Sequence, residues 1–237
     1  MGLYEEPIFR IAGDRGLLVE LGDEIDPQIN KTVRILNLLI LRSNIQGVVE
    51  TIPTYRSILV YYDPIKIEVR ELCVIIRKLA SKKQEITLPE PKLIEIPVCY
   101  GGEFGPDIEI VAQSHNLTIE EVIKLHSQPL YQIYMMGFTP GFPFLGVLPE
   151  LLATPRLSTP RLQVPAGSVG IAGNQTGIYP ITSPGGWNLI GRTPLKLFSP
   201  ERKEPFLYAP GDFIRFRPIS LEEFQEIHGK EYGDSSS

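Results

Sequence analysis

The stretch PAGSVGIAGNQTGIYPITSPGGWNLIGRTP, residues 165–194, constrains the fold of this chain more than any other segment. It holds seven of the 21 glycines, four prolines and the only tryptophan. A phosphate-binding P-loop needs a lysine after its second glycine, and no lysine lies between Gly167 and Gly191. The dinucleotide-binding motif needs G-x-G-x-x-G followed by a helix, whereas the spacing here is G-x-x-G-x-x-G. A flexible linker would leave many large apolar side chains in water, so we predict a turn-rich wall of a folded domain.

The first 88 residues alternate between strand and helix patterns. Two apolar segments flank the turn at residues 13–16, which predicts a β-hairpin, and Asp26-Pro27 is a typical helix start. Apolar residues then recur at helical spacing to about Ser43, and again from Lys66 to Ser81 after a second pair of strands. The order β-β-α-β-β-α predicts an α+β domain over residues 1–88, with both helices on one face of an antiparallel sheet.

A domain boundary is predicted at residues 89–92, where Pro89 and Pro91 disfavour a helix. Two short helices are expected beyond it, the second opened by a capping box at residues 118–121. From residue 131 onward, glycine or proline interrupts every short apolar run until a last helix begins near residue 220. This pattern predicts a closed or nearly closed barrel, so residues 93–228 are expected to form an all-β barrel domain and residues 229–237 a disordered tail.

The distribution of charge suggests an anion site. The net charge of -5 argues against general binding of nucleic acid. Between residues 122 and 200 the only acidic residue is Glu150, although several arginines and lysines are present. This segment is either kept free of carboxylates for an anionic ligand, or poor in charge because it is rich in glycine and proline. In the first interpretation Arg161 and Arg192 are candidate substrate-binding residues. Arg156 and Arg161 each stand in a copy of the sequence T-P-R-L. They either bind an anion together or form ordinary salt bridges.

Polar positions in the glycine-rich stretch are further candidates for a ligand site. Gln175 and Tyr179 are candidate catalytic residues, and Gly173, Thr176 and Ser183 are candidate substrate-binding positions. Such groups beside bare backbone N–H groups suit a small carboxylate or amide. The alternative is that they only satisfy the hydrogen bonds of turns.

His126 lies on the apolar stripe of the second short helix, just before the barrel region. Two interpretations stay open for it. It is either a structural histidine in the core or a general acid or base at the edge of a cleft, which makes it the third catalytic candidate.

The loop MMGFTPGFPFLG, residues 135–146, carries Phe138, Pro140, Phe142 and Phe144. Its prolines restrict the chain, so the loop is expected to be rigid. Aromatic rings held rigidly at a surface suit partner binding, which makes these four residues the candidate partner-binding set. The alternative is that the rings belong to the barrel core.

Several segments of the chain resemble the KipI family, also called the allophanate-hydrolase-subunit-1 family. They are PVCYGGEFGPD, LHSQPLYQIYMMGFTPGFPFLG, residues 154–198 and PGDFIRFRPI. The resemblance covers nearly all of the second half, whereas the first half matches in element order and in its GDRGLLVELG opening. It implies a cyclophilin-like barrel and, for the bacterial members, the role of the B subunit in an ATP-dependent 5-oxoprolinase.

The same resemblance implies partners and a substrate. Two further proteins, one KipA-like and one of the LamB/YcsF type, would join this chain in opening the ring of 5-oxoproline, a small lactam with a carboxylate, to glutamate. ATP is then expected in the complex rather than necessarily on this chain, and no metal is predicted. Two alternatives stay open: an inhibitor of a sporulation-type histidine kinase, and a biotin-dependent carboxyltransferase component.

The sequence also predicts where the protein resides. The first residues lack the basic and apolar pattern of a secretion signal, and no apolar run reaches the roughly 18 residues of a membrane span. A cytoplasmic protein without membrane or nucleic-acid partners is therefore expected.

Overall fold

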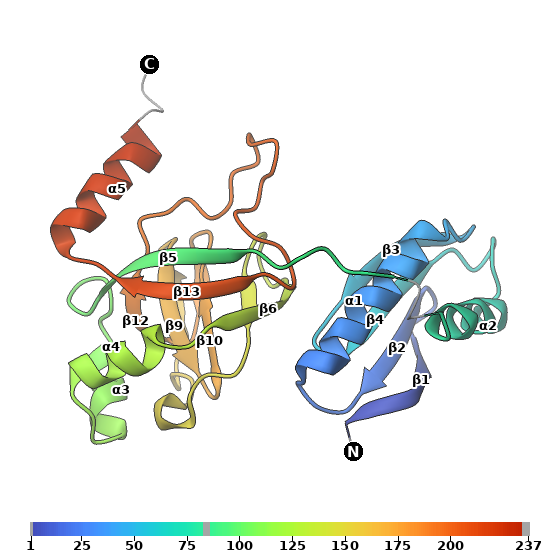
Figure 1. Cartoon of the computed structure of the whole chain (residues 1–237), viewed down its shortest axis with the longest axis horizontal. Coiled ribbons are helices and arrows are strands. Elements are labelled where there is room, and N and C mark those ends of the chain that lie inside the picture. The colour runs from blue at the N-terminus through green and yellow to red at the C-terminus, as the bar shows by residue number, and fades with distance from the viewer. Residues whose placement is uncertain (1, 83–85, 234–237) are drawn as a thin grey trace. The chain divides into compact units, whose positions relative to one another are not determined.

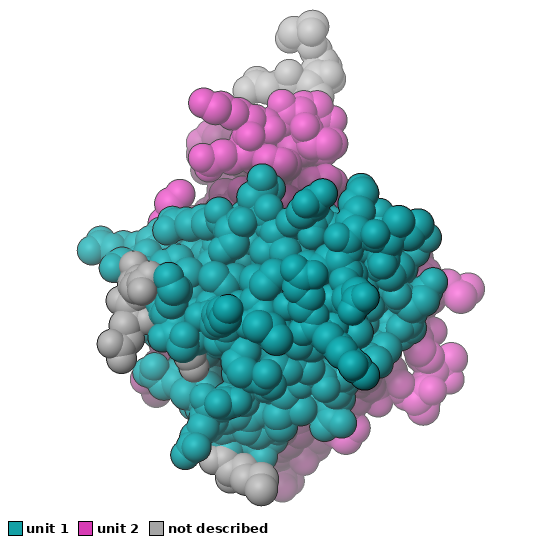
Figure 2. Space-filling view, turned by 90° about the vertical axis from the view of Figure 1, so that its right-hand side faces the viewer, with its two compact units in different colours: residues 1–90 teal, residues 91–237 magenta. Residues whose placement is uncertain are grey.

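The computed structural model describes residues 2–82 and 86–233 of the 237-residue chain. The chain divides into two compact units, Met1–Glu90 and Pro91–Ser237, which Figure 2 shows in different colours. Each unit has a hydrophobic core of its own.

The first unit is a four-stranded antiparallel sheet covered by two helices (Figure 1). Along the chain its elements are β1 (Leu3–Ala12), β2 (Gly16–Gly22), α1 (Pro27–Arg42), β3 (Val48–Pro53), β4 (Ser57–Tyr62) and α2 (Val69–Ala80). The strand order in the sheet is β1-β2-β4-β3. Alternate residues of β2 and β4 are buried together with apolar residues of both helices in one cluster, so α1 and α2 share one face of the sheet.

Local capping sets the start of α1. The carboxylate of Asp26 accepts hydrogen bonds from the backbone N–H groups of Gln28 and Ile29, at 2.8 and 3.1 Å, and Pro27 occupies the first helical position. The predicted start is therefore confirmed. The second helix begins later than the predicted Lys66, because the N–H of Lys66 bonds the carbonyl of Asp63 in a preceding turn.

The second unit is built on a seven-stranded sheet in the order β10-β9-β12-β5-β13-β6-β7. Its strands are β5 (Leu93–Tyr100), β6 (Tyr131–Met136), β7 (Pro143–Leu145), β9 (Ser168–Ala172), β10 (Gln175–Ile178), β12 (Asn188–Arg192) and β13 (Phe213–Pro218). The two edges of the sheet approach each other, because Val147 bridges Gln175 and the N–H of Leu148 bonds the carbonyl of Asn174 at 3.0 Å. The sheet is thus a nearly closed barrel, as predicted.

The label all-β fits only the barrel sheet, because the unit also holds the two short helices and the last helix that the sequence predicts. The unit contains α3 (Ile108–Ser114), α4 (Ile119–Ser127), a short 3-10 helix (Glu150–Leu152) and α5 (Leu221–Gly233). The capping box that opens α4 is confirmed, because the side chains of Thr118 and Glu121 each accept the other's backbone N–H. The likeness to cyclophilin stays a prediction.

The predicted disordered tail also needs correction. Helix α5 continues through residue 233, so residues 229–233 are helical, whereas residues 234–237 lie outside the described residues. Side chains one turn apart stabilise this end of the helix. The ammonium of Lys230 lies 2.7 Å from the carboxylate of Glu226, and the rings of His228 and Tyr232 stack at 4.4 Å.

The glycine-rich stretch, residues 165–194, forms one wall of the barrel. It contains β9, β10 and β12 together with β11 (Ser183–Gly185), which pairs with β8 (Arg161–Val164). The predicted turn-rich wall is therefore confirmed. Within the part of the chain that the structure describes, no helix has the length and apolar character needed to cross a bilayer.

Candidate functional site

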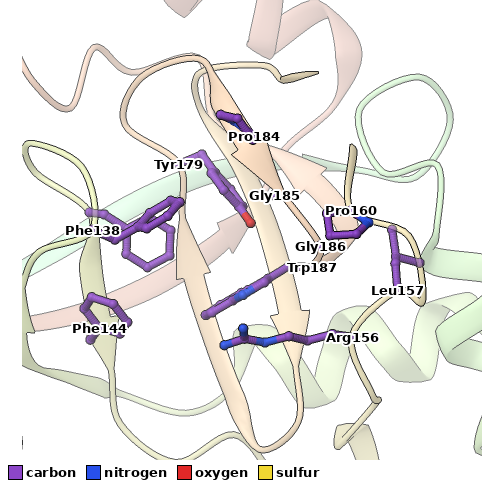
Figure 3. A pocket seen from close by; sticks show the side chains of 11 residues that line it. Phe138, Phe144, Arg156, Leu157, Pro160, Tyr179, Pro184, Gly185, Gly186 and Trp187 are labelled. Carbon is purple, nitrogen blue, oxygen red and sulfur yellow. The ribbon is translucent and has the colours of Figure 1, made fainter. Parts of the chain in front are cut away.

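A pocket of about 390 Å³ opens in the second unit, and five of its eleven lining residues are aromatic. Figure 3 shows the rings of Phe138 and Phe144 on one side, with the side chains of Arg156 and Trp187 reaching towards them from the other. We call this cavity the aromatic pocket. It is lined by Phe138, Phe142, Phe144, Arg156, Leu157, Pro160, Tyr179, Pro184, Gly185, Gly186 and Trp187. Its size is typical of sites for small organic ligands, roughly 300–1,000 Å³.

Three separate segments of the chain build the aromatic pocket. The first is the loop between β6 and β7 together with β7 itself, the second precedes β8, and the third runs from the end of β10 through β11 towards β12. All three are rich in glycine or proline, which fixes the backbone and lets it approach the cavity closely. The barrel brings together segments that are far apart in the sequence.

One wall of the aromatic pocket is a rigid cluster of rings. Phe142 meets Tyr179 edge to face with ring centroids 5.3 Å apart, and it meets Trp187 in the same way at 5.6 Å. All three side chains are buried in a cluster distinct from the main barrel core. The hydroxyl of Tyr208 donates to the carbonyl of Gly141 at 2.9 Å and thereby holds the adjoining loop.

The candidate partner-binding residues divide into different environments. Phe142 is only 2% exposed, so it cannot itself dock on a partner, and the structure places it in a core cluster. Phe138 is 66% exposed and adopts φ 65°, a left-handed conformation that bulky residues rarely take. Phe138 also borders a second cavity, which Pro140 helps to line, and Phe144 is half-buried in the aromatic pocket. Partner binding by this loop stays a prediction, and Phe138 is its exposed aromatic residue.

Tyr179, a candidate catalytic residue, lies in the aromatic pocket. Burial raises the pKa of its phenol above the ordinary value, although a hydrogen bond from the backbone of Trp187 and the charges of Arg156 and Arg161 oppose this rise. The phenol is therefore protonated at neutral pH. It can serve as a hydrogen-bond donor to a ligand, but not as a ready general base.

The candidate arginines are engaged elsewhere. A guanidinium nitrogen of Arg161 lies 2.7 Å from the carboxylate of Asp107, a side chain only 5% exposed, and another donates to the carbonyl of Trp187 at 3.4 Å. The Nε–H of Arg192 donates to the carbonyl of Ala166 at 2.9 Å. Neither arginine lines the aromatic pocket. Arg161 thus has the salt bridge that the sequence left as an alternative.

Arg156 is the arginine that lines the aromatic pocket. Its side chain is exposed, and within residues 2–82 and 86–233 it has no salt-bridge or hydrogen-bond partner. The T-P-R-L repeat drew attention to both Arg156 and Arg161, but nothing in it distinguishes the paired arginine from the unpaired one.

His126 is fully buried in the barrel core and does not line the aromatic pocket. Its Nδ1 lies 2.8 Å from the hydroxyl of Tyr100, and its Nε2 lies 2.8 Å from Oγ1 of Thr176. Thr176 itself donates to the carbonyl of Gly170 at 3.1 Å, so its hydroxyl accepts from Nε2–H and Nδ1 accepts from Tyr100. The imidazole is thus a neutral link in a chain of hydrogen bonds. Burial lowers its pKa from the usual 6.5 to about 3.

This environment predicts acid sensitivity of the second unit. His126 stays neutral in the folded state but binds a proton below about pH 6.5 when the chain unfolds, so stability is lost as pH falls from 6.5 towards 3. We expect protonation of His126 in the unfolded chain to lower the free energy of unfolding by about 2 kcal/mol when the pH falls from 7 to 5. Urea unfolding followed by fluorescence of the single tryptophan, Trp187, measures this unit at each pH. Equal stability at the two pH values would contradict the prediction.

The remaining candidates are scattered around the wall. Thr176 is buried against His126, and Gly173 lies in the exposed turn between β9 and β10. Gln175 begins β10 at the closing edge of the barrel. Ser183 is buried beside Pro184, which does line the aromatic pocket. The structure therefore brings only Tyr179 of the candidate catalytic and substrate-binding residues into the pocket.

The side chains that most often bind metals do not gather at one place. In the described portion of the chain, no group of three or more His, Cys, Asp or Glu side chains is arranged to hold a metal ion. The aromatic pocket itself offers ring surfaces, backbone groups, one phenol and one guanidinium. These groups suit an organic anion.

The fold and the aromatic pocket together define a two-unit protein whose barrel-like unit carries a pocket of a size typical of small-ligand sites. The sequence matches the family described as carboxyltransferase domain, subdomain C and D, over residues 7–208. The chain belongs to this family, in agreement with the resemblance found in its sequence.

Individual relatives agree with this assignment. The chain is 44% identical to a protein of Bacillus subtilis (strain 168) named as the B subunit of 5-oxoprolinase, over 90% of this chain and 92% of that protein. Among solved structures, TTHA0988 superposes with a TM-score of 0.76 at 38% identity, over 87% of this chain but only 40% of TTHA0988. The protein PH0987 from Pyrococcus horikoshii is 49% identical with a TM-score of 0.55, over 92% of this chain and all of that one.

Proposed function

We propose that this chain is the B subunit of an ATP-dependent 5-oxoprolinase. With a KipA-like partner and a LamB/YcsF-type partner, it would open 5-oxo-L-proline to L-glutamate. The observation that carries this proposal is the 44% identity to the Bacillus subtilis protein of that name along nearly the whole of both chains. The aromatic pocket supports it, because ring surfaces with a single guanidinium suit a small ring that bears a carboxylate.

The chemistry of the pocket supports a component of a complex rather than a complete enzyme. Hydrolysis of a lactam needs a base to activate water and a donor for the leaving amine. Tyr179 is the titratable side chain of the pocket other than arginine, and its raised pKa keeps it protonated. We infer that the groups activating water, and those handling ATP, come from the partner proteins. The glycine-rich stretch lacks the lysine of a P-loop, in line with a nucleotide site outside this chain.

Reconstitution tests the proposal. The chain is purified alone, with each partner separately, and with both partners, and ATP-dependent formation of glutamate from 5-oxo-L-proline is measured. We expect activity only from the complete set. Full activity from this chain alone, or none from the complete set, would contradict the proposal. The histidine-kinase inhibitor and the biotin-dependent carboxyltransferase component stay alternative predictions.

A further inference from the structure

We propose that Arg156 binds the carboxylate of the ligand in the aromatic pocket, with the ligand ring held against the aromatic walls. The identity of that ligand as a carboxylated lactam rests on the proposed function. The assignment of Arg156 rests on the geometry of the pocket itself. It replaces the sequence-based choice of Arg161 and Arg192 for this role.

The first argument is the availability of the guanidinium. Arg156 lines the aromatic pocket and has no hydrogen-bond or salt-bridge partner among the residues that the structure describes. Figure 3 shows its side chain extending alongside Trp187 towards Phe144, so the charged end lies at the cavity. An unpaired guanidinium presents a planar fork of donors that matches the two oxygens of a carboxylate.

The second argument is that the other two arginines are committed. Recruiting Arg161 to a ligand would leave the buried carboxylate of Asp107 without its cation, which is strongly unfavourable. That carboxylate also accepts the backbone N–H of Leu189 at 2.7 Å, so the pair fixes the start of α3 to β12. Arg192 in turn bonds the carbonyl of Ala166, away from the pocket lining.

The third argument is the charge around the pocket. Its lining residues, as described by the structure, include no aspartate or glutamate, and Glu150 is the only acidic residue between residues 122 and 200. The charge of Arg156 is also close enough to act on the phenol of Tyr179. The local field thus favours an anion, and the low-dielectric aromatic walls strengthen its attraction to the guanidinium.

The walls then determine what kind of anion fits. The rings of Phe138, Phe144 and Trp187 offer surface to the apolar edge of a small ring. The phenol of Tyr179 and the backbone at Gly185 and Gly186 lie on the same cavity and can pair with a lactam amide. A small cyclic amide that carries one carboxylate can contact the aromatic walls and also pair with the guanidinium, whereas an uncharged lactam can only contact the walls.

Binding to this chain alone tests the assignment. Trp187 is the only tryptophan and lines the pocket, so its fluorescence reports occupancy directly, with calorimetry on the same samples as a second readout. The ligands are 5-oxo-L-proline and 2-pyrrolidinone, the same ring without the carboxylate. The proteins are the wild type, Arg156→Gln, Arg156→Lys and the control Arg215→Gln. Arg215 is an exposed residue of β13 outside the pocket, 3.8 Å from Glu95.

We expect wild type and Arg215→Gln to bind 5-oxo-L-proline about 10- to 100-fold more tightly than 2-pyrrolidinone, as one charge-assisted contact provides. Arg156→Gln should remove this preference without changing the affinity for 2-pyrrolidinone, and Arg156→Lys should keep part of it. Thermal unfolding checks that the variants fold. We expect them to fold, because Arg156 has no hydrogen-bond or salt-bridge partner among the described residues.

Three outcomes would overturn the assignment: no preference for the carboxylate in the wild type, an undiminished preference in Arg156→Gln, or no saturable binding of either ligand. Each is separate from the proposed function. A complete complex that forms glutamate while Arg156→Gln keeps the preference leaves the role in 5-oxoprolinase intact and rejects Arg156. Carboxylate-dependent binding without activity of the complete complex supports Arg156 and rejects that role.

Discussion

Alanine in place of Gly167 is expected to destabilise the second unit by about 2–5 kcal/mol, from two independent penalties. Gly167 adopts φ 84°, and the left-handed region disfavours any residue with a Cβ by about 1–2 kcal/mol. A Cβ at this position would also lie well inside contact distance of the carbonyl oxygen of Thr193, a backbone atom that cannot move aside freely. Such overpacking typically adds about 1–3 kcal/mol.

Gly173 provides the matched control for this prediction. It also has a positive φ, 55°, but an added Cβ would meet no atom within 4 Å. Gly173→Ala should therefore show only the backbone penalty, about 1–2 kcal/mol. Urea unfolding followed by Trp187 fluorescence measures both variants. Equal destabilisation by the two substitutions would show that the close approach to Thr193 contributes nothing.

The features that the sequence predicted well are those encoded locally. Asp26-Pro27 and the Thr118–Glu121 box cap their helices through residues two or three positions away, so the pattern contains the whole interaction. The barrel wall at residues 165–194 was predictable because so many apolar side chains between glycines must be buried. The tail was mispredicted over residues 229–233 because contacts between neighbouring turns of α5, such as Glu226 with Lys230, continue the helix there.

The site was harder to predict because its residues are distinguished by distant contacts. Arg156 and Arg161 stand in identical T-P-R-L contexts, and only Asp107, 54 residues before Arg161 in the sequence, separates their roles. Phe138 and Phe142 likewise share one loop, but the packing of Tyr179 and Trp187 around Phe142 buries one ring and leaves the other exposed. Composition and spacing identified the right segments, and the barrel decided which side chains face the cavity.

Leucine in place of His126 is expected to destabilise the second unit by about 3 kcal/mol at pH 7. The substitution removes the hydrogen bonds to Tyr100 and Thr176, each worth about 1 kcal/mol, and leaves the buried hydroxyl of Tyr100 without its acceptor. Thr176 keeps its bond to the carbonyl of Gly170. The double variant with Tyr100→Phe should therefore be less destabilised than the sum of the single substitutions, because no unpaired phenol remains. The exposed His228→Leu is the control: it loses the surface stacking on Tyr232 and should cost at most about 1 kcal/mol, well below the loss at His126.

The destabilisation caused by His126→Leu should depend on pH. This dependence distinguishes a histidine held neutral by burial from one that only fills space in the core. Because the folded-state pKa is about 3, the wild type loses about 2 kcal/mol between pH 7 and pH 5, as its unfolded chain gains a proton on His126. The leucine variant has no imidazole to protonate, so it lacks this contribution. The gap between wild type and variant should shrink from about 3 kcal/mol at pH 7 to about 1 kcal/mol at pH 5. A gap that stays constant over this range would mean that His126 titrates alike in both states, contrary to its buried place between Tyr100 and Thr176.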